Sequence, residues 1–226
     1  MKRSEINQNI RRAKQLLEAH HFKLPRWAYW SPDDWQKAGP EAAEIKECML
    51  GWDITDFGSN DFYKIGLTLF TIRNGNLARP DNAKTYAEKI MLVQVDQITP
   101  MHFHWAKMED IINRGGGELL IQLYNATPDE DLDRTGDVTV SIDAIAHTVK
   151  AGDVVTLAPG DSITLPPRLY HKFWAAGGDC MVGEVSRTND DTKDNRFHEP
   201  VGRFPRIEED EPPIHLLCNE YPDRGR

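Results

Sequence analysis

The stretch His-Phe-His-Trp-Ala-Lys-Met-Glu at residues 102–109 carries two histidines separated by one residue, with a glutamate five residues after the second. Alternate side chains of a β-strand point to the same face, so the imidazoles of His102 and His104 converge if that face lines a cavity. Glu109 adds a carboxylate, and an isolated His171 follows a later segment bounded by glycine and proline. Three imidazole nitrogens and one carboxylate oxygen suit a divalent Mn, Fe, Co, Ni or Zn ion that keeps positions open for water or substrate. We therefore predict that these four residues form one metal site.

A His-x-His pair alone arises by chance in many proteins, but here the glycines and prolines around it have a definite spacing. The two segments read His102-x-His104-x4-Glu109-x6-Gly116 and Gly160-x5-Pro166-x-Arg168-x2-His171. They resemble the two signature motifs of the cupin superfamily, which direct two histidines and a glutamate, and then one histidine, into a small β-barrel. Asp96 and Arg168 stand where these motifs usually have glycine, and Ala175 stands where the second usually ends in asparagine. None of the three is a predicted metal ligand.

The chain from Trp52 onward has the pattern of an all-β protein. Its short segments rich in β-branched or large apolar residues are 66–73, 90–98, 118–124, 138–142, 153–157, 162–165 and 180–186. Turn-forming clusters divide them at 73–76, 127–129, 151–153 and 176–179. Many short strands at near-regular spacing predict a sandwich or barrel, and the cupin resemblance implies a mainly β barrel of the jelly-roll type. No glycine pattern typical of a nucleotide-binding fold follows a strand, so no nucleotide cofactor is expected.

The first 50 residues have a helical pattern instead. Ser4 is a candidate N-cap of a helix whose apolar residues recur at steps of three and four until about residue 20. Ser31 begins a second helix with a proline in its first turn, and 40–49 forms a further short helical stretch. We therefore expect a helical extension packed on the barrel, the cupin barrel itself, and a C-terminal tail packed on the barrel, at 1–51, 52–200 and 201–226. The acidic run at 208–211 is expected to be an exposed loop.

The composition excludes several classes of partner. The chain of 226 residues carries a formal net charge of −9 and has no basic stripe, so nucleic acid is excluded and a small neutral substrate is expected. No apolar run is long enough to span a bilayer, and the N-terminus begins with charged residues where a secretory signal would be apolar. Three widely separated cysteines indicate reduced thiols. We expect a cytoplasmic protein that contacts no membrane.

Four longer runs narrow the resemblance within the cupins. They are 50–58 (Leu-Gly-Trp-Asp-Ile-Thr-Asp-Phe-Gly), 69–75 (Leu-Phe-Thr-Ile-Arg-Asn-Gly), 102–117 and 184–191 (Glu-Val-Ser-Arg-Thr-Asn-Asp-Asp). Together they resemble the D-lyxose isomerase family over nearly the whole chain. The resemblance implies a divalent-metal sugar isomerase, usually manganese dependent, that interconverts D-lyxose with D-xylulose and often D-mannose with D-fructose. It also implies a homodimer.

Conversion of an aldose to a ketose moves a hydrogen from C2 to C1 and changes the charge on O1 and O2, so it needs a Lewis acid and a general base. Glu184 is the predicted base, because it shares one face of a predicted strand with Cys180, Val182 and Ser186 in a run that otherwise reads as buried. The alternative is a solvated or structurally paired Glu184. Lys107 is predicted to donate to a sugar oxygen or to carry a proton between O1 and O2. Strand alternation points Lys107 away from the histidines unless the chain bulges.

Further residues are predicted to bind the sugar, and they are Lys89, Trp105, Asp191, Asp194 and Arg196. Lys89 lies on the predicted strand that leads into the first motif. In the alternative, its neighbour Glu88 neutralises the charge of Lys89 and it binds no sugar. The last three lie in a polar loop that either closes over the barrel mouth or is only a turn. Trp105, like Trp174, offers an apolar ring face to the carbon side of a sugar, unless it packs in the core.

Other functions suit the same ligand set. An iron or nickel dioxygenase would use the open metal positions for oxygen, and a sugar sensor would bind without a placed base. A phosphosugar isomerase would need cations at the pocket rim, for which Arg168 and Lys172 are candidates. Proton transfer is favoured over a hydride shift, because Glu184 and the lysines supply a base and a relay.

Overall fold

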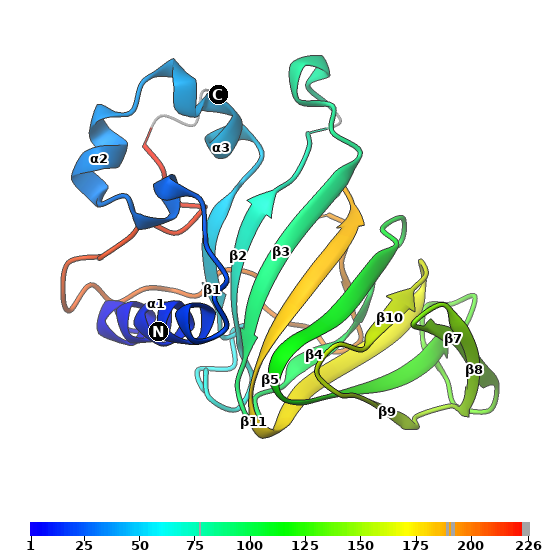
Figure 1. The fold of residues 1–226 in the computed structure, drawn as a ribbon. Helices are drawn as coiled ribbons and strands as arrows, with labels where there is room; N and C mark the ends of the chain where they lie inside the picture. Colours follow the sequence, from blue (N-terminus) through cyan, green and yellow to red (C-terminus); the bar gives the residue numbers. More distant parts are fainter. Residues whose placement is uncertain (77, 189, 191–192, 223–226) are drawn as a thin grey trace.

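A computed structural model describes residues 1–76, 78–188, 190 and 193–222 and has a mainly β architecture (Figure 1). Its helical elements are α1 (Arg3–Ala19), η1 (Arg26–Tyr29), α2 (Pro32–Lys37), η2 (Pro40–Ala42), α3 (Ala43–Glu47) and η3 (Pro80–Asn82). Its strands are β1 (Gly51–Thr55), β2 (Leu67–Arg73), β3 (Tyr86–Val93), β4 (Thr99–Phe103), β5 (Glu109–Ala126), β6 (Leu132–Asp133), β7 (Asp137–Ile142), β8 (Ile145–Lys150), β9 (Val154–Leu157), β10 (Ser162–Leu165), β11 (Leu169–Arg187) and β12 (Arg196–Phe197). The predicted mainly β class with an N-terminal helix is confirmed.

The strands form one antiparallel sheet that curls on itself. Its order is β1-β2-β3-β11-β5-β10-β7-β8, with β4 and β12 beside β11, and β6 and β9 beside β5. One edge of β11 pairs with β5 along nearly its whole length. The other edge pairs with β3 through residues 180–187 but with β4 near His171. Because β3 and β4 share one edge of the same long strand, the sheet bends into a barrel rather than lying flat.

The interior of the barrel holds the main apolar core. Side chains alternate between the two faces of each strand, so β5 supplies Leu119, Ile121 and Leu123, and β7, β9 and β10 add further valines, leucines and isoleucines. Buried polar and charged side chains interrupt this core on β1, β3, β4 and the last part of β11. These interruptions place a polar site inside an otherwise apolar barrel.

A glycine-rich irregularity divides β11 into two parts. The register with β5 shifts between Ala176 and Cys180 and again just after Met181. The two backbones lie too close for a side chain there, because a Cβ on Gly117 would lie 2.3 Å from the carbonyl oxygen of Gly178. Odd-numbered residues of β11 join the barrel core before the irregularity and even-numbered residues join it afterwards. His171 and Glu184 therefore both face the interior.

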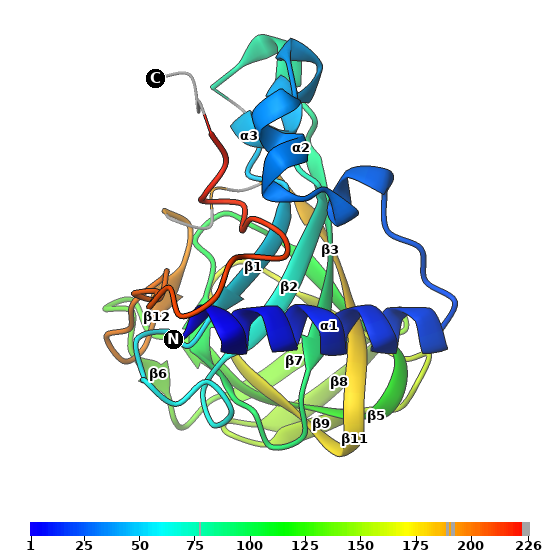
Figure 2. The same ribbon diagram turned by 90° about the vertical axis from the view of Figure 1, so that its left-hand side faces the viewer.

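Helix α1 lies across the outer face of β2 and β3, as Figure 2 shows. Its apolar residues Ile6, Ile10, Ala13 and Leu17 are buried in a second core with side chains from those strands. The predicted helix is confirmed, but its N-cap is Lys2 and the prediction of Ser4 as the cap is wrong. Ser4 is already inside the helix, and its hydroxyl donates to Asp210 of the C-terminal tail at 2.6 Å.

The C-terminal tail is fastened to α1 by charged and polar pairs. The acidic run 208–211 is exposed or half-exposed as expected, yet carboxylates from it bind the helix. Glu209 and Glu220 both pair with the buried Arg3, and Glu211 accepts from Asn7 at 2.6 Å. The N-terminal and C-terminal segments thus hold each other on the outside of the barrel. Within the described residues, none of the helices has the length and apolar character needed to cross a membrane.

The predicted strands agree best where burial alternates. The segment 162–165 coincides with β10, whereas the segment predicted to end at 98 ends at Val93, because Asp96 turns the chain with a φ of 59°. Arg168 has a φ of 64°, so both residues found at glycine positions of the cupin motifs keep a left-handed backbone. Strand β8 was not predicted, since its residues are exposed or half-exposed and give no alternation.

Candidate active site

Three buried histidines meet inside the barrel. His102 lies on β4, His104 follows that strand directly, and His171 lies opposite His102 on β11. One ring nitrogen of each lies within 4.8 Å of the corresponding atoms of the other two. The structure therefore brings together the three histidines predicted from the two motifs, and this group has the geometry to hold a metal ion.

Backbone carbonyls fix the direction of each imidazole. The Nδ1 atoms of His102, His104 and His171 lie 2.7, 2.8 and 3.0 Å from the carbonyl oxygens of Pro100, Asp194 and Leu169. A carbonyl oxygen only accepts hydrogen bonds, so each Nδ1 must carry a proton, and in a neutral imidazole of this tautomer Nε2 keeps its lone pair. Metal-binding histidines are oriented in this way, with the remote nitrogen donating to an outer partner.

Glu109 completes the donor group at the start of β5. Its Oε1 lies 3.2 Å from Nε2 of both His104 and His171. Oε1 of Glu109 and Nε2 of His104 are buried atoms without a hydrogen-bond partner, and such atoms in a native interior call for an additional ligand. A divalent cation would satisfy both, so the residues present fit a metal centre of three nitrogens and one oxygen.

The protonation states around this group also suit a cation. Burial, together with the neighbouring His171 and His104, holds the pKa of His102 well below its ordinary value, so its imidazole stays neutral. Burial alone would raise the pKa of Glu109, but Lys107 and His104 outweigh it and hold that pKa well below its usual range. Neutral imidazole and ionised carboxylate are the forms that bind metals.

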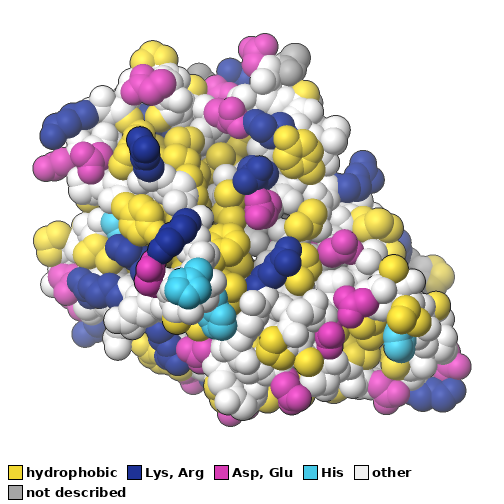
Figure 3. Space-filling view, in the orientation of Figure 1, with side chains coloured by type: hydrophobic (Ala, Val, Ile, Leu, Met, Phe, Trp, Pro, Cys, Tyr) yellow, Lys and Arg dark blue, Asp and Glu magenta, His cyan; other side chains and the backbone are white. Residues whose placement is uncertain are grey.

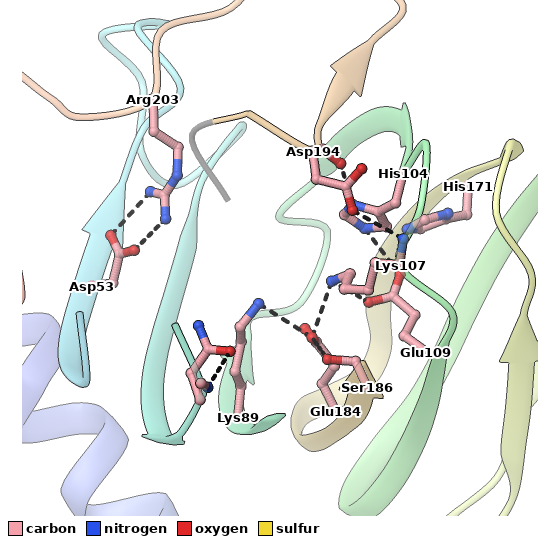
Figure 4. A network of polar contacts seen from close by, with 12 residues as sticks. Asp53, Lys89, His104, Lys107, Glu109, His171, Glu184, Ser186, Asp194 and Arg203 are labelled. Carbon is pink, nitrogen blue, oxygen red and sulfur yellow. Dashed lines mark hydrogen bonds and ion pairs between the residues drawn. The ribbon is translucent and has the colours of Figure 1, made fainter. Parts of the chain in front are cut away.

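A network of buried charges adjoins the histidines (Figure 4). Nζ of Lys107 lies 2.6 Å from Oε2 of Glu109 and donates to Oε1 of Glu184 at 3.0 Å. The same Glu184 oxygen accepts from the Ser186 hydroxyl at 2.9 Å and lies 3.2 Å from Nζ of Lys89. All four charged side chains are at most 6% exposed. Two ammonium groups and two carboxylates therefore balance one another beside the metal group.

The direction of Lys107 resolves the question left open by strand alternation. β4 ends at Phe103, so residues 104–108 form a loop in which alternation does not apply. The carboxylate of Asp194 accepts from the backbone N–H groups of Ala106 and Lys107 at 3.0 and 2.9 Å. These bonds fix the turn that points Lys107 inward. Glu88 pairs with Arg73, which leaves Lys89 facing Glu184.

These groups line a cavity that opens to solvent. Apolar side chains form much of its wall, and they are Phe57, Leu67, Leu69, Met91, Ile111, Phe173 and Phe197. The polar lining residues are Thr55, Lys89, Thr99, His102, His104, Lys107, Glu109, His171, Glu184, Asn195 and Arg203. A cavity that combines apolar walls with convergent polar groups is typical of a small-molecule site.

Some predicted sugar-binding residues lie outside this lining. Trp105 is 39% exposed, packs on Phe103 and donates from its indole N–H to Glu130. Arg196 also pairs with Glu130. Asp194 holds backbone groups as described above, and Asp191 lies outside the described residues. The cations considered for a phosphosugar are turned away as well, since Arg168 lies over Phe103 and Lys172 over Trp174.

Sequence reasoning missed several lining residues. Thr55 and Phe57 come from β1 and the turn after it. Asn195, Phe197 and Arg203 come from residues 193–203, which we call the mouth-crossing segment. The first two lie in the run 50–58 that carries the family resemblance, which was the available signal. The others lie in irregular chain, where no periodicity shows which side chains turn inward.

Comparisons with known proteins show the family and the fold of the chain. A family model described as D-lyxose isomerase matches residues 1–221. The chain is 50% identical to a D-lyxose/D-mannose isomerase of Escherichia coli O157:H7 and 49% identical to one of Serratia proteamaculans, each over 224 residues and 98% of both chains. The fold resembles a mutant L-ribose isomerase of Acinetobacter sp. DL28 solved with L-ribose, with a TM-score of 0.61, 17% identity and coverage of 92% of this chain and 98% of that one. This likeness shows that the two chains share a fold.

Proposed function

Because the chain belongs to the D-lyxose isomerase family, we propose that it interconverts D-lyxose with D-xylulose and D-mannose with D-fructose. The observation that carries the proposal is the contact between two sets of groups in one cavity. Lys107 touches both Glu109, beside the three histidines, and Glu184. A site for a cation and a carboxylate–ammonium pair are what aldose–ketose isomerisation requires.

The reaction moves two hydrogens. The C2 hydrogen of the aldose leaves as a proton and is returned to C1, while the O2 proton is transferred to O1. Glu184 takes the proton from C2 and returns it to C1 on the same face of the sugar. Its ion pairs with Lys89 and Lys107 keep it close to the reacting carbons. The product is the ketose, with the carbonyl at C2 and a hydroxyl at O1.

Lys107 serves the oxygens in this scheme. Its ammonium group donates a proton to O1 as the carbonyl is lost, and the neutral amine that remains accepts the O2 proton as the new carbonyl forms. Lys89, on the other side of Glu184, donates a hydrogen bond to a sugar hydroxyl. Burial of all three side chains excludes water that would otherwise compete for these protons.

His102, His104, His171 and Glu109 would hold the divalent cation. When bound, it supplies Lewis-acid stabilisation of the negative charge that develops on the sugar oxygens. We propose Mn²⁺ as this ion, because the family resemblance implies it and the mixed nitrogen and oxygen donor set suits it.

Metal dependence and substrate can be tested together. The purified protein is assayed on D-lyxose and D-mannose before chelation, after EDTA treatment and after addition of Mn²⁺. We expect activity to disappear with EDTA and to return with Mn²⁺. Full activity in EDTA would remove the metal from the scheme, and oxygen consumption during turnover would favour a dioxygenase instead. Transfer of solvent deuterium to C1 or C2 would separate proton transfer from a hydride shift.

The cysteines and the family resemblance bear on the cellular compartment and the oligomeric state. All three cysteines are buried thiols outside any disulfide, which suits a reducing compartment, and we propose a cytoplasmic enzyme. The family resemblance supports a homodimer, which sedimentation equilibrium would test.

A further inference from the structure

A pair of charged residues stands at the far side of the cavity from the histidines. Asp53 on β1 is 3% exposed, and both its carboxylate oxygens accept from the guanidinium of Arg203. Figure 4 shows this pair across the cavity from His104, His171 and Lys107. Sheet order gives the same separation, since β2 and β3 lie between β1 and β11.

Local structure turns Asp53 toward the barrel. Its neighbours Trp52 and Ile54 belong to the core beneath α1, so alternation directs Asp53 to the opposite face. β1 is already held by its ladder with β2, in which all five of its residues are paired. A buried carboxylate on such a strand is costly unless it is paired, and Arg203 supplies that pairing from the segment that crosses the barrel mouth.

Arg203 separates two cavities. It lines the catalytic cavity and also a larger neighbouring one, which opens to solvent. Asp53, Thr71, Met49, Asn74 and Phe204 line the second cavity. A sugar that reaches past the catalytic cavity would therefore meet the guanidinium first.

The two sugars of the proposed function, on which this inference rests, differ at one end of their carbon chains. D-Lyxose and D-mannose have the same configuration at C2, C3 and C4, and D-mannose has one further carbon at the end remote from C1. If C1 and C2 of both sugars lie against Glu184 and Lys107, the additional carbon must lie at the opposite end of the chain. That end faces the Asp53–Arg203 pair.

We propose that Arg203, held by Asp53, contacts the terminal part of the sugar and sets the preference between five-carbon and six-carbon substrates. A guanidinium presents several donors in a rigid plane and can bind a hydroxyl group while it remains paired with a carboxylate. The pentose ends at Arg203 with its terminal hydroxyl. The hexose places its last hydroxymethyl group where the guanidinium lies, so Arg203 must move toward the larger cavity to accept it.

The test compares kcat and KM for D-lyxose and D-mannose in the Mn²⁺-loaded enzyme. In the double variant Asp53→Asn with Arg203→Ala, neither charge is left unpaired. We expect the ratio of kcat/KM for D-lyxose over D-mannose to fall by about 10-fold or more, within the range of discrimination that one carbon provides. The decrease in kcat/KM for D-lyxose should come mainly from an increase in its KM. The matched control is Arg12→Met, which breaks an ion pair with Asp179 outside both cavities and should leave the ratio unchanged.

An unchanged ratio, including equal losses of kcat/KM for both sugars, would overturn the inference and show that the pair has only a structural role. Thermal unfolding and circular dichroism show whether the double variant folds. If it does not, Arg203→Lys keeps the charge but loses the planar donors, and an unchanged ratio in this variant would equally overturn the inference. A wild-type enzyme that converts neither sugar would instead reject the proposed function.

Discussion

The carbonyl oxygen of Asp194 lies 2.8 Å from Nδ1 of His104, so one residue of the mouth-crossing segment orients a member of the histidine group. The carboxylate of the same aspartate holds the backbone of the loop between His104 and Glu109. Asp194 thus supports the predicted ligand and the inward turn of Lys107 at once. It is a positioning residue rather than the sugar contact that the sequence suggested.

Substitution of Asp194 by alanine should separate these two contributions. Asp194→Ala removes the carboxylate but keeps the backbone carbonyl, so Mn²⁺ affinity should change little while kcat falls, because Lys107 is no longer held inward. We expect a fall in kcat of about 10-fold to 100-fold, comparable to the loss of an outer partner of a functional group. Isothermal titration with Mn²⁺ and steady-state kinetics measure the two quantities. Asp161→Ala is a matched control, since its carboxylate accepts from the N–H of Ala158 outside the cavity. A parallel loss in the control would show a general effect of removing a turn.

Lys107 should be required for turnover. Lys107→Met keeps the length of the side chain but removes the proton donor between Glu109 and Glu184. We expect kcat to fall by about 100-fold or more, the usual contribution of a positioned acid or base. Lys172→Met is the control, because Lys172 lies over the ring of Trp174 outside the cavity lining. Activity of Lys107→Met within a few-fold of wild type would contradict the assigned role.

Metal binding should depend on His171. His171→Gln removes one of three imidazole donors, and we expect Mn²⁺ affinity to fall by more than about 100-fold, beyond the cost of losing an outer-shell partner. The increase in melting temperature that Mn²⁺ gives to the wild type should shrink accordingly, because a ligand stabilises only what it binds. The exposed His147 on β8 provides His147→Gln as a control. Equal Mn²⁺ stabilisation of both variants would argue against a metal at this site.

Arg3 should contribute strongly to stability but not to catalysis. Its side chain is 2% exposed and pairs with Glu209 and Glu220. Arg3→Ala removes charged hydrogen bonds to two carboxylates, of which Glu209 is 57% and Glu220 21% exposed, so we expect a loss of about 1–3 kcal/mol in the free energy of unfolding. Urea denaturation measures it, with Arg11→Ala on the exposed side of α1 as the control. A loss below about 1 kcal/mol would show that the tail is held by its apolar contacts alone.

Much of the site was predictable because it follows local rules. The meeting of His102, near the end of β4, with His104, just beyond it, and with His171 follows from their spacing and from the two motifs. The inward direction of Glu184 followed from the alternation of the segment 180–186, because Cys180 and Val182 both join the barrel core although a register shift follows Met181. For these residues, local periodicity and tertiary position agree.

Other parts depend on contacts that periodicity does not encode. Lys107 faces inward because Asp194, 87 residues later, holds its backbone N–H. Arg203 reaches the cavity from irregular chain by pairing with Asp53, 150 residues earlier. The cap of α1 was misplaced because Ser4 binds Asp210, which the helix pattern alone does not reveal.

The glycine-rich irregularity in β11 also decides whether His171 and Glu184 can lie in the same cavity. His171 and Glu184 have opposite parity, so an uninterrupted strand would turn one of them out of the barrel. Loss of a single residue between Ala176 and Cys180 would reverse the faces of all later residues of β11. Glu184, the proposed base, would then point out of the barrel while His171, a proposed metal ligand, stayed inside, even in a protein that still folds. Insertions and deletions in this short segment should therefore be far less tolerated than substitutions on the outer face of the same strand.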